Sequence, residues 1–206
     1  MITLYGNGQS RSFRALWALE EAKVTYIYHS VTFGSEKDPF GTLSKEYKQL
    51  NIQGKVPTYV EDEIVLTESA AILNYIAATH PSKKLAPLDN VKLKAKYDEV
   101  CFFVLSDLEQ PVWTNGKHRF AIPEEYRISE VLDTATWEFK QSIKALEQLL
   151  DGKKYVIGET FTMADILVAH TLNWAINFHF DVPVKLQQYR RRMYERPACK
   201  RACEML

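Results

Sequence analysis

Two serine hydroxyls, Ser10 and Ser12, follow the glycine turn Gly6-Asn7-Gly8 and stand at the start of a predicted helix. A hydroxyl group there can donate a hydrogen bond to an anion, while the positive end of the helix dipole stabilises the same charge. Either serine can equally serve as the cap of that helix. The segment has no GxGxxG pattern, which argues against a dinucleotide, and no GxSxG pattern, which argues against a nucleophilic serine.

A second polar group combines Lys55-Val56-Pro57 with residues that open a later helix. Glu68 and Ser69 stand at that helix N-terminus, where free N–H groups and the dipole favour a carboxylate ligand. Alternatively, Ser69 or Thr67 only caps the helix. The proline begins a strand, where it cannot donate a ladder hydrogen bond. Only about 5–6% of X–Pro bonds are cis, so composition alone assigns no cis bond here.

The elements that position these residues mix strand and helix signals over the first 80 positions. A strand, a helix and a second strand in succession predict a parallel, right-handed βαβ unit. Two later strands flank a short acidic turn and predict an antiparallel hairpin. The predicted order is strand 2–5, helix to about residue 22, strand 25–31, a loop with one short helix over 33–54, strands 58–60 and 64–66, and helix 69–79.

A proline-containing stretch without periodicity, residues 80–90, predicts a linker, and the pattern beyond it is helical. Apolar residues recur every three or four positions from Leu132 to Leu150, which predicts a long amphipathic helix. Thr162 and Asp165 have the spacing of a capping box, a common structural device. Pro197 is expected to break the last helical stretch.

The composition excludes several function classes. The chain has 206 residues, of which 46% are hydrophobic and 25% charged, as in soluble globular proteins. Lys plus Arg and Asp plus Glu both total 26, and zero net charge argues against a nucleic-acid partner. No apolar run approaches the ~18 residues of a membrane span, and no signal peptide is recognisable. The five histidines and three cysteines lack zinc or disulfide spacing, so we expect no metal, and free thiols in a reducing cytoplasm.

Taken together and in this order, the motifs resemble the soluble glutathione S-transferases, bacterial-like and of serine type, over essentially the whole chain. The resemblance implies an α/β thioredoxin-like N-terminal domain of βαβ-ββα order that binds glutathione. A linker and an all-α C-terminal domain with the second-substrate pocket follow, which gives domains 1–79 and 91–206 around linker 80–90. The matching segments are 4–6, 10–21, 51–57, 66–76, 158–166 and 196–198; within them, Ile52 replaces a proline that many relatives carry.

The resemblance also implies which residues hold glutathione. Pro57 matches the family's cis-proline, and the backbone of Val56 would pair with the cysteinyl part of glutathione. Ser69 and its N–H would take the γ-glutamyl carboxylate, while Glu68 would take the ammonium group. Lys55 matches a position near the glycyl end.

Ser10, four residues before Arg14, matches the catalytic serine of the serine-type classes. It would donate a hydrogen bond to the glutathione sulfur, whose free thiol has a pKa of ~8.5, without becoming a nucleophile. Lowering that pKa by about two units requires ~2.7 kcal/mol, within reach of one hydrogen bond to a charged group (~1.5–3 kcal/mol) plus a helix dipole (~0.3–1 kcal/mol). Ser12 and Tyr5 are rivals for this role.

Other classes of the family match less well. No cysteine lies at the first strand–helix junction, which argues against the cysteine-type classes and against disulfide exchange. The serine-serine-cysteine signature of the zeta isomerases is absent as well. Asp107 lies where related classes send a carboxylate across the dimer to the γ-glutamyl ammonium, or it is a solvated helix residue.

The second-substrate pocket is less well specified. Aromatic residues on helices belong either to such a pocket or to the core. The candidates are Trp113, His118, Phe120, Trp174 and Phe178. We expect a cytoplasmic, homodimeric glutathione transferase that activates the glutathione thiol for attack on a small hydrophobic electrophile. The alternatives are a glutathione-dependent peroxidase or reductase, and a glutathione-binding protein without catalysis.

Overall fold

The computed structural model describes residues 1–206 and divides into two compact units. One unit comprises Met1–Ala86 together with Glu195–Leu206, and the other comprises Pro87–Tyr194. The boundary after Ala86 falls inside the predicted linker. The C-terminal segment differs from the prediction, which placed it in the helical domain, because its helix α9 (Pro197–Glu204) packs against a helix of the first unit.

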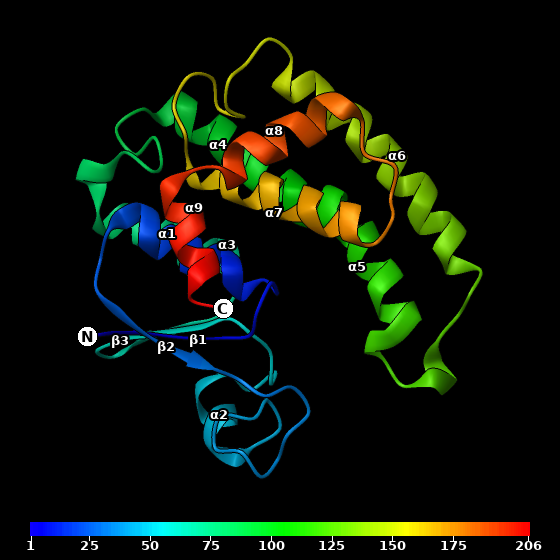
Figure 1. Ribbon diagram of the computed structural model, residues 1–206. Coiled ribbons are helices and arrows are strands. Elements are labelled where there is room, and N and C mark those ends of the chain that lie inside the picture. The colour runs from blue at the N-terminus through cyan, green and yellow to red at the C-terminus, as the bar shows by residue number, and fades with distance from the viewer. The chain divides into compact units, whose positions relative to one another are not determined.

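The first unit is built on the sheet whose strands β1, β2 and β3 are labelled in Figure 1. This sheet has four strands in the order β2-β1-β3-β4. Strand β1 (Ile2–Gly6) pairs in parallel with β2 (Tyr26–Ser30) and antiparallel with β3 (Thr58–Glu61). Strand β3 pairs antiparallel with β4 (Ile64–Leu66). The predicted parallel unit and hairpin are therefore confirmed.

The helices of this unit bury their apolar sides. Helix α1 (Ser12–Ala22) and helix α3 (Ser69–Thr79) pack against each other, and both end where the sequence predicted. The predicted inward residues of α3 are all fully buried: Ile72, Leu73 and Ile76. The single short helix of the long loop is α2 (Lys45–Leu50), which begins after the cap residue Ser44. The Ser44 hydroxyl accepts a hydrogen bond from the backbone N–H of Tyr47 at 3.0 Å.

The second unit is helical throughout. Its helices are α4 (Val91–Phe103), α5 (Glu109–Gly116), α6 (Val131–Leu150), α7 (Met163–Asn177) and α8 (Val184–Tyr194). Two π-helical segments, Val104–Leu108 and Lys117–Ala121, precede and follow α5. Helix α7 is buried along most of its length and forms the centre of the unit.

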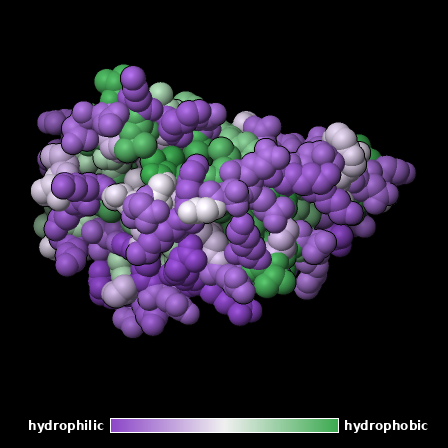
Figure 2. Space-filling model, turned by 90° about the horizontal axis from the view of Figure 1, so that it is seen from above, coloured by the Kyte–Doolittle hydropathy of each residue, from purple (hydrophilic) through white to green (hydrophobic).

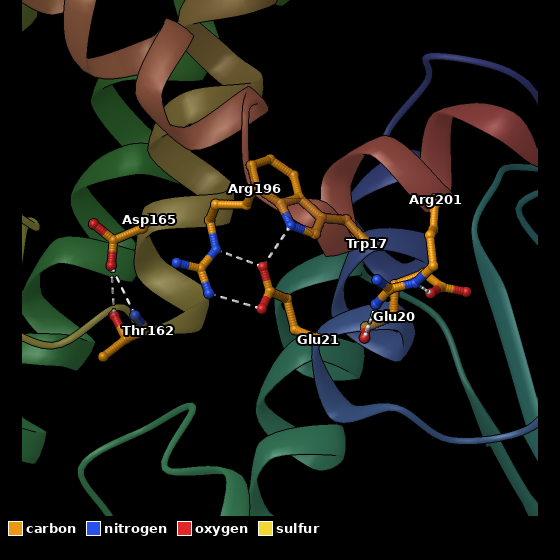
Figure 3. A network of polar contacts seen from close by, with 7 residues as sticks. All are labelled: Trp17, Glu20, Glu21, Thr162, Asp165, Arg196 and Arg201. Carbon is orange, nitrogen blue, oxygen red and sulfur yellow. Dashed lines mark hydrogen bonds and ion pairs between the residues drawn. The ribbon is translucent and has the colours of Figure 1, made fainter.

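The predicted capping box at the start of α7 is confirmed. The buried Asp165 carboxylate accepts a hydrogen bond from the N–H group of Thr162 at 2.8 Å (Figure 3). It also accepts one from the N–H group of Val156 at 2.8 Å. The Tyr189 hydroxyl donates to the same carboxylate at 2.6 Å. Burial raises the pKa of Asp165, and these donors act in the opposite direction. The box therefore joins the start of α7 to α8.

In the first unit, Glu21 of α1 binds Arg196, which precedes α9 (Figure 3). The guanidinium donates to both carboxylate oxygens, at 2.6 and 2.8 Å, and Trp17 Nε1 donates at 3.0 Å. Pro197 separates α8 from α9 as expected, but it is also the first residue of α9, a position that tolerates the missing N–H. This contact anchors the C-terminal helix on α1.

One face of the molecule is largely polar (Figure 2). Hydrophilic side chains dominate the face seen from above, and hydrophobic side chains gather there in separate groups (Figure 2). No helix combines the length and the apolar character that crossing a bilayer requires.

Candidate functional site

The loop between β1 and α1 brings the hydroxyl oxygens of Ser10 and Ser12 to 2.5 Å from each other. Ser12 is fully buried, and its Oγ accepts a hydrogen bond from the backbone N–H of Asn7 at 2.9 Å. Ser10 is partly exposed, and its Oγ accepts from the Ser12 N–H at 3.3 Å. Neither serine is the cap residue of α1, which is Arg11, so that expectation was wrong.

Gly6 explains why Ser12 faces inward. A β-carbon at Gly6 would lie 2.6 Å from Ser12 Cβ and 2.9 Å from its Oγ, closer than real side chains approach. The Asn7 side chain donates a hydrogen bond to the Val31 carbonyl at 2.8 Å, which ties the loop to the end of β2. The two serines therefore sit on a loop that is fixed from both sides.

Tyr5, the third candidate donor, belongs to an aromatic cluster. Its ring stacks on His29 with 5.2 Å between centroids. Phe40 and Tyr47 lie at 5.8 and 6.0 Å from the same ring. Tyr5 and His29 are paired residues of β1 and β2, so the cluster covers one face of the sheet.

The peptide bond between Val56 and Pro57 is cis, as the resemblance implied. Two side chains hold the preceding carbonyl of Lys55. The Tyr47 hydroxyl donates to it at 2.6 Å, and Asn51 Nδ2 donates at 2.7 Å. No sequence signal pointed to either of these two side chains, although Asn51 opens the motif that contains Pro57.

The same two side chains also contact Thr58, the first residue of β3. Its Oγ1 lies 2.9 Å from the Tyr47 hydroxyl and 3.1 Å from Asn51 Nδ2. The Lys55 side chain points elsewhere and donates to Gln53 Oε1 at 2.8 Å. This network fixes the backbone on both sides of Val56.

The backbone has an unusual conformation at Glu68, the residue before α3. Glu68 is exposed and has φ +63°, the left-handed region that non-glycine residues seldom adopt outside constrained sites. Ser69 is buried, and its Oγ accepts from Nη1 of the fully buried Arg14 at 3.3 Å. No side chain at positions 67–69 caps the helix, so the capping interpretation was wrong. In the sequence, Arg14 served only to locate Ser10, and its contact with Ser69 was not predicted.

The sheet brings these segments together at one end of its strands. Tyr5, near the end of β1, is paired with Thr58, so the Ser10 loop and Pro57 leave the sheet at the same end. Leu66 is paired with Tyr59, and the chain passes from there directly to Glu68 and Ser69. Arg14 of α1 reaches Ser69 of α3 across the same end. This end of the sheet thus combines the Ser10–Ser12 hydroxyl pair, the N-terminus of α3 and the buried guanidinium of Arg14.

Four of the five candidate pocket residues of the helical unit form a continuous aromatic row. Trp113 and Trp174 stack at 6.3 Å, and Trp174 and Phe178 stack at 6.2 Å. Phe120 meets Phe178 edge-on at 5.6 Å. His118 lies outside the row, and its Nδ1 accepts from the Ile128 N–H at 3.0 Å.

Asp107 lies in the π-helical segment between α4 and α5, and it is exposed. Its carboxylate accepts a hydrogen bond from the neighbouring Ser106 hydroxyl. The structure brings no group of three His, Cys, Asp or Glu residues together in a way that could hold a metal ion. None of the three cysteines forms a disulfide, and Cys203 is exposed whereas Cys101 and Cys199 are buried.

Comparison with known proteins shows to which protein family the chain belongs. Residues 1–78 match the glutathione S-transferase N-terminal domain, and residues 110–197 match the glutathione S-transferase C-terminal domain. A probable maleylacetoacetate isomerase of Caenorhabditis elegans is 31% identical over 178 residues, which cover 84% of this chain and 78% of that protein. The chain belongs to the glutathione S-transferase family.

Solved glutathione S-transferases have the same fold. The theta class enzyme of Xanthomonas axonopodis pv. citri, solved with glutathione bound, is 27% identical with a TM-score of 0.81, covering 98% of this chain and 96% of that one. The bacterial enzyme BphK, solved as a ternary complex, has a TM-score of 0.86 at 23% identity, with 98% of both chains covered. The thioredoxin-like unit and the helical unit are therefore confirmed as the two parts of a glutathione S-transferase.

Proposed function

We propose that this chain is a glutathione transferase that activates the glutathione thiol at Ser10 for attack on a small, hydrophobic electrophile. The proposal rests on one observation: the Ser10 loop, Pro57 and the start of α3 lie at the same end of the sheet. Cytoplasmic location is part of the proposal, since none of the three cysteines forms a disulfide.

Ser10 is the proposed thiolate donor because of how the hydroxyl protons can be arranged. Ser12 accepts from the Asn7 N–H, and its nearest hydrogen-bond acceptor is Ser10 Oγ at 2.5 Å, against 3.4 Å for the Asn7 carbonyl. When Ser12 donates to Ser10, the Ser10 proton is available for a sulfur atom. The partly exposed Ser10 then stabilises the thiolate, and the buried Ser12 orients it.

The proposed contacts with glutathione use residues at the same end of the sheet. Val56, next to the cis bond, would pair its backbone with the cysteinyl part, and Lys55 would approach the glycyl carboxylate. The γ-glutamyl carboxylate would bind at Ser69, where the α3 N-terminus and the buried Arg14 both favour negative charge. Glu68, exposed beside it, would bind the ammonium group.

The electrophile is proposed to bind at the aromatic row of the helical unit, Trp113, Trp174, Phe178 and Phe120. Flat apolar molecules pack well on such rings. We also propose a homodimer, in which the exposed Asp107 would be free to reach the partner's glutathione. His118, engaged by Ile128, is not part of the proposed pocket.

One relative raises a second candidate function, glutathione-dependent isomerisation, because it is named a probable maleylacetoacetate isomerase. The Gln9–Ser12 junction lacks the serine-serine-cysteine signature of that class. We therefore place thiol transfer first. Both reactions would use the same thiolate.

Steady-state kinetics test the proposal. We expect turnover of glutathione with 1-chloro-2,4-dinitrobenzene and a lower rate with cumene hydroperoxide. Ser10→Ala is expected to lower kcat/KM about 10- to 100-fold, which corresponds to one hydrogen bond to a charged group. Ser82→Ala, which changes an exposed serine of the first unit, is the matched control and should leave kcat/KM unchanged.

The other outcomes separate the alternatives. A dominant rate with the hydroperoxide would favour the peroxidase. Glutathione binding without turnover of any acceptor would contradict the transferase and favour a binding protein.

A further inference from the structure

A cavity of about 270 Å³ lies entirely within the helical unit. It is partly open to solvent, and three segments line it: the end of α5 with the π-helical turn after it, the middle of α6, and the loop that follows α7. Its size suits a small molecule, below the range of drug-sized ligand sites.

The inner wall of this cavity is aromatic. Phe139 of α6 is 1% exposed and Phe180 is 9% exposed, and their ring centroids lie 4.7 Å apart. Phe178 contributes a third ring. Its ring can lie close to α5 because residue 116 is a glycine: a β-carbon there would lie only 2.8 Å from the ring. These rings offer a flat apolar group a large contact area.

One buried polar side chain in the cavity lacks a partner. Asn115 is 4% exposed, and its Oδ1 has no hydrogen-bond partner within the protein. An unsatisfied buried polar atom costs about 1–3 kcal/mol, so such groups in native proteins normally meet a ligand or water. The amide can turn either its oxygen or its nitrogen toward a bound molecule.

The rim of the cavity carries an excess of positive charge. Arg119 and Lys140 line it, against the single carboxylate of Asp181, and His179 is the remaining titratable group. Neither Arg119 nor Lys140 forms an ion pair through its side chain, whereas Lys94 of the same unit pairs with a carboxylate. Two unpaired cations beside an apolar cavity favour an anionic guest.

We propose that this cavity binds a small aromatic carboxylate. The ring packs on Phe139 and Phe180, and the carboxylate lies between Arg119 and Lys140. Asn115 donates or accepts a hydrogen bond at the buried end. The proposal concerns binding within the helical unit and does not depend on Ser10 or on thiol transfer.

Titration calorimetry of the full chain with benzoate tests the site, with glutathione kept at saturation so that the carboxylate site of the first unit is occupied. Benzamide, which has nearly the same shape and no charge, is the matched ligand. We expect benzoate to bind at least about tenfold more tightly than benzamide. The double variant Arg119→Gln/Lys140→Gln should weaken benzoate binding about tenfold and leave benzamide unchanged.

Lys144→Gln is the matched control, because Lys144 is exposed one turn further along α6 and does not line the cavity. It should bind benzoate like the unchanged protein. Equal affinity for benzoate and benzamide, or an unchanged benzoate affinity in the double variant, would overturn the proposal. All of these substitutions lie at exposed positions, so the variants are expected to fold.

Phe178 belongs both to this cavity and to the aromatic row proposed for the electrophile. A further measurement therefore asks whether the bound carboxylate is a second substrate or a separate effector. Competitive inhibition by benzoate against 1-chloro-2,4-dinitrobenzene supports an acceptor that is itself a carboxylate. Non-competitive inhibition, or binding without inhibition, supports a separate effector site. If the chain has no transferase activity, the calorimetry still decides whether the cavity binds the anion.

Discussion

The hydroxyl oxygens of Ser10 and Ser12 lie 2.5 Å apart, with Ser12 buried and Ser10 reaching the surface of the loop. This relationship gives the two serines different roles. The Ser12 hydroxyl accepts a hydrogen bond from the backbone N–H of Asn7, while Ser10 is the hydroxyl that a ligand can reach. In the proposed mechanism, activation of the thiol would depend on Ser10 directly and on Ser12 through the position of Ser10.

Gly6→Ala tests how the loop positions the hydroxyl pair. The new β-carbon would overlap Ser12, so we expect a loss of about 1–3 kcal/mol in the free energy of unfolding. We also expect a lower kcat in the folded variant, because Ser12 must move. Urea unfolding and steady-state kinetics measure the two effects. Gly152→Ala meets no atom within 4 Å and should leave kcat unchanged, although its φ of +67° costs some stability. An unchanged kcat in Gly6→Ala would contradict this role of Ser12.

Tyr47→Phe tests the network that holds the backbone next to Val56. The variant loses the donor at 2.6 Å from the Lys55 carbonyl, although Asn51 still donates. We expect the KM for glutathione to rise about three- to tenfold, with little change in kcat, because one neutral hydrogen bond contributes ~1 kcal/mol. Tyr75→Phe removes a hydroxyl that donates to Glu61 and is the matched control. A similar KM in both variants would show that the network does not position glutathione.

Arg196→Met tests how the C-terminal helix is anchored. The Glu21 carboxylate is 8% exposed, and the substitution leaves it with Trp17 as its partner. We expect a loss of about 2 kcal/mol in the free energy of unfolding, since a nearly buried charge is left without its ion-pair partner. Lys185→Met breaks the exposed pair with Asp151 and should cost less than about 0.5 kcal/mol. Equal losses in the two variants, measured by urea unfolding, would contradict the anchoring role.

The buried thiol of Cys101 predicts a dependence of stability on alkaline pH. Burial raises its pKa to about 12, whereas an unfolded thiol has a pKa of about 8.5. Above about pH 8.5 the unfolded chain loses a proton that the folded chain keeps, so stability falls as pH rises toward 12, by up to ~1.4 kcal/mol per pH unit. Cys101→Ala should show a shallower decline in urea unfolding, and exposed Cys203→Ala should not. Identical slopes in the wild type and Cys101→Ala would refute this assignment.

Local sequence signals predicted most of the fold. Helix 69–79, the hairpin and the capping box at Thr162 follow from short patterns that a single segment contains. The C-terminal helix was assigned to the other unit, because its apolar residues indicate a buried face but not which helix covers it. The Arg196–Glu21 contact that decides this joins residues 175 positions apart.

The same limit applies to the site. The types of Ser10, Ser12, Glu68 and Ser69 predict an anion site from local positions, whereas the alternative that the serines cap their helices was wrong. The direction in which Ser12 points depends on the space beside Gly6, and the contact of Arg14 with Ser69 spans 55 positions. Such contacts come from packing between elements, which periodicity and motif spacing do not encode.

The most direct test is an ultraviolet titration of the thiolate of bound glutathione in the wild type, Ser10→Ala and Ser12→Ala. We predict that the wild type lowers the thiol pKa by about one to two units, that Ser10→Ala abolishes the shift, and that Ser12→Ala reduces it. A wild type that binds glutathione with an unshifted thiol pKa, or a shift that persists in Ser10→Ala, would contradict thiol activation by Ser10.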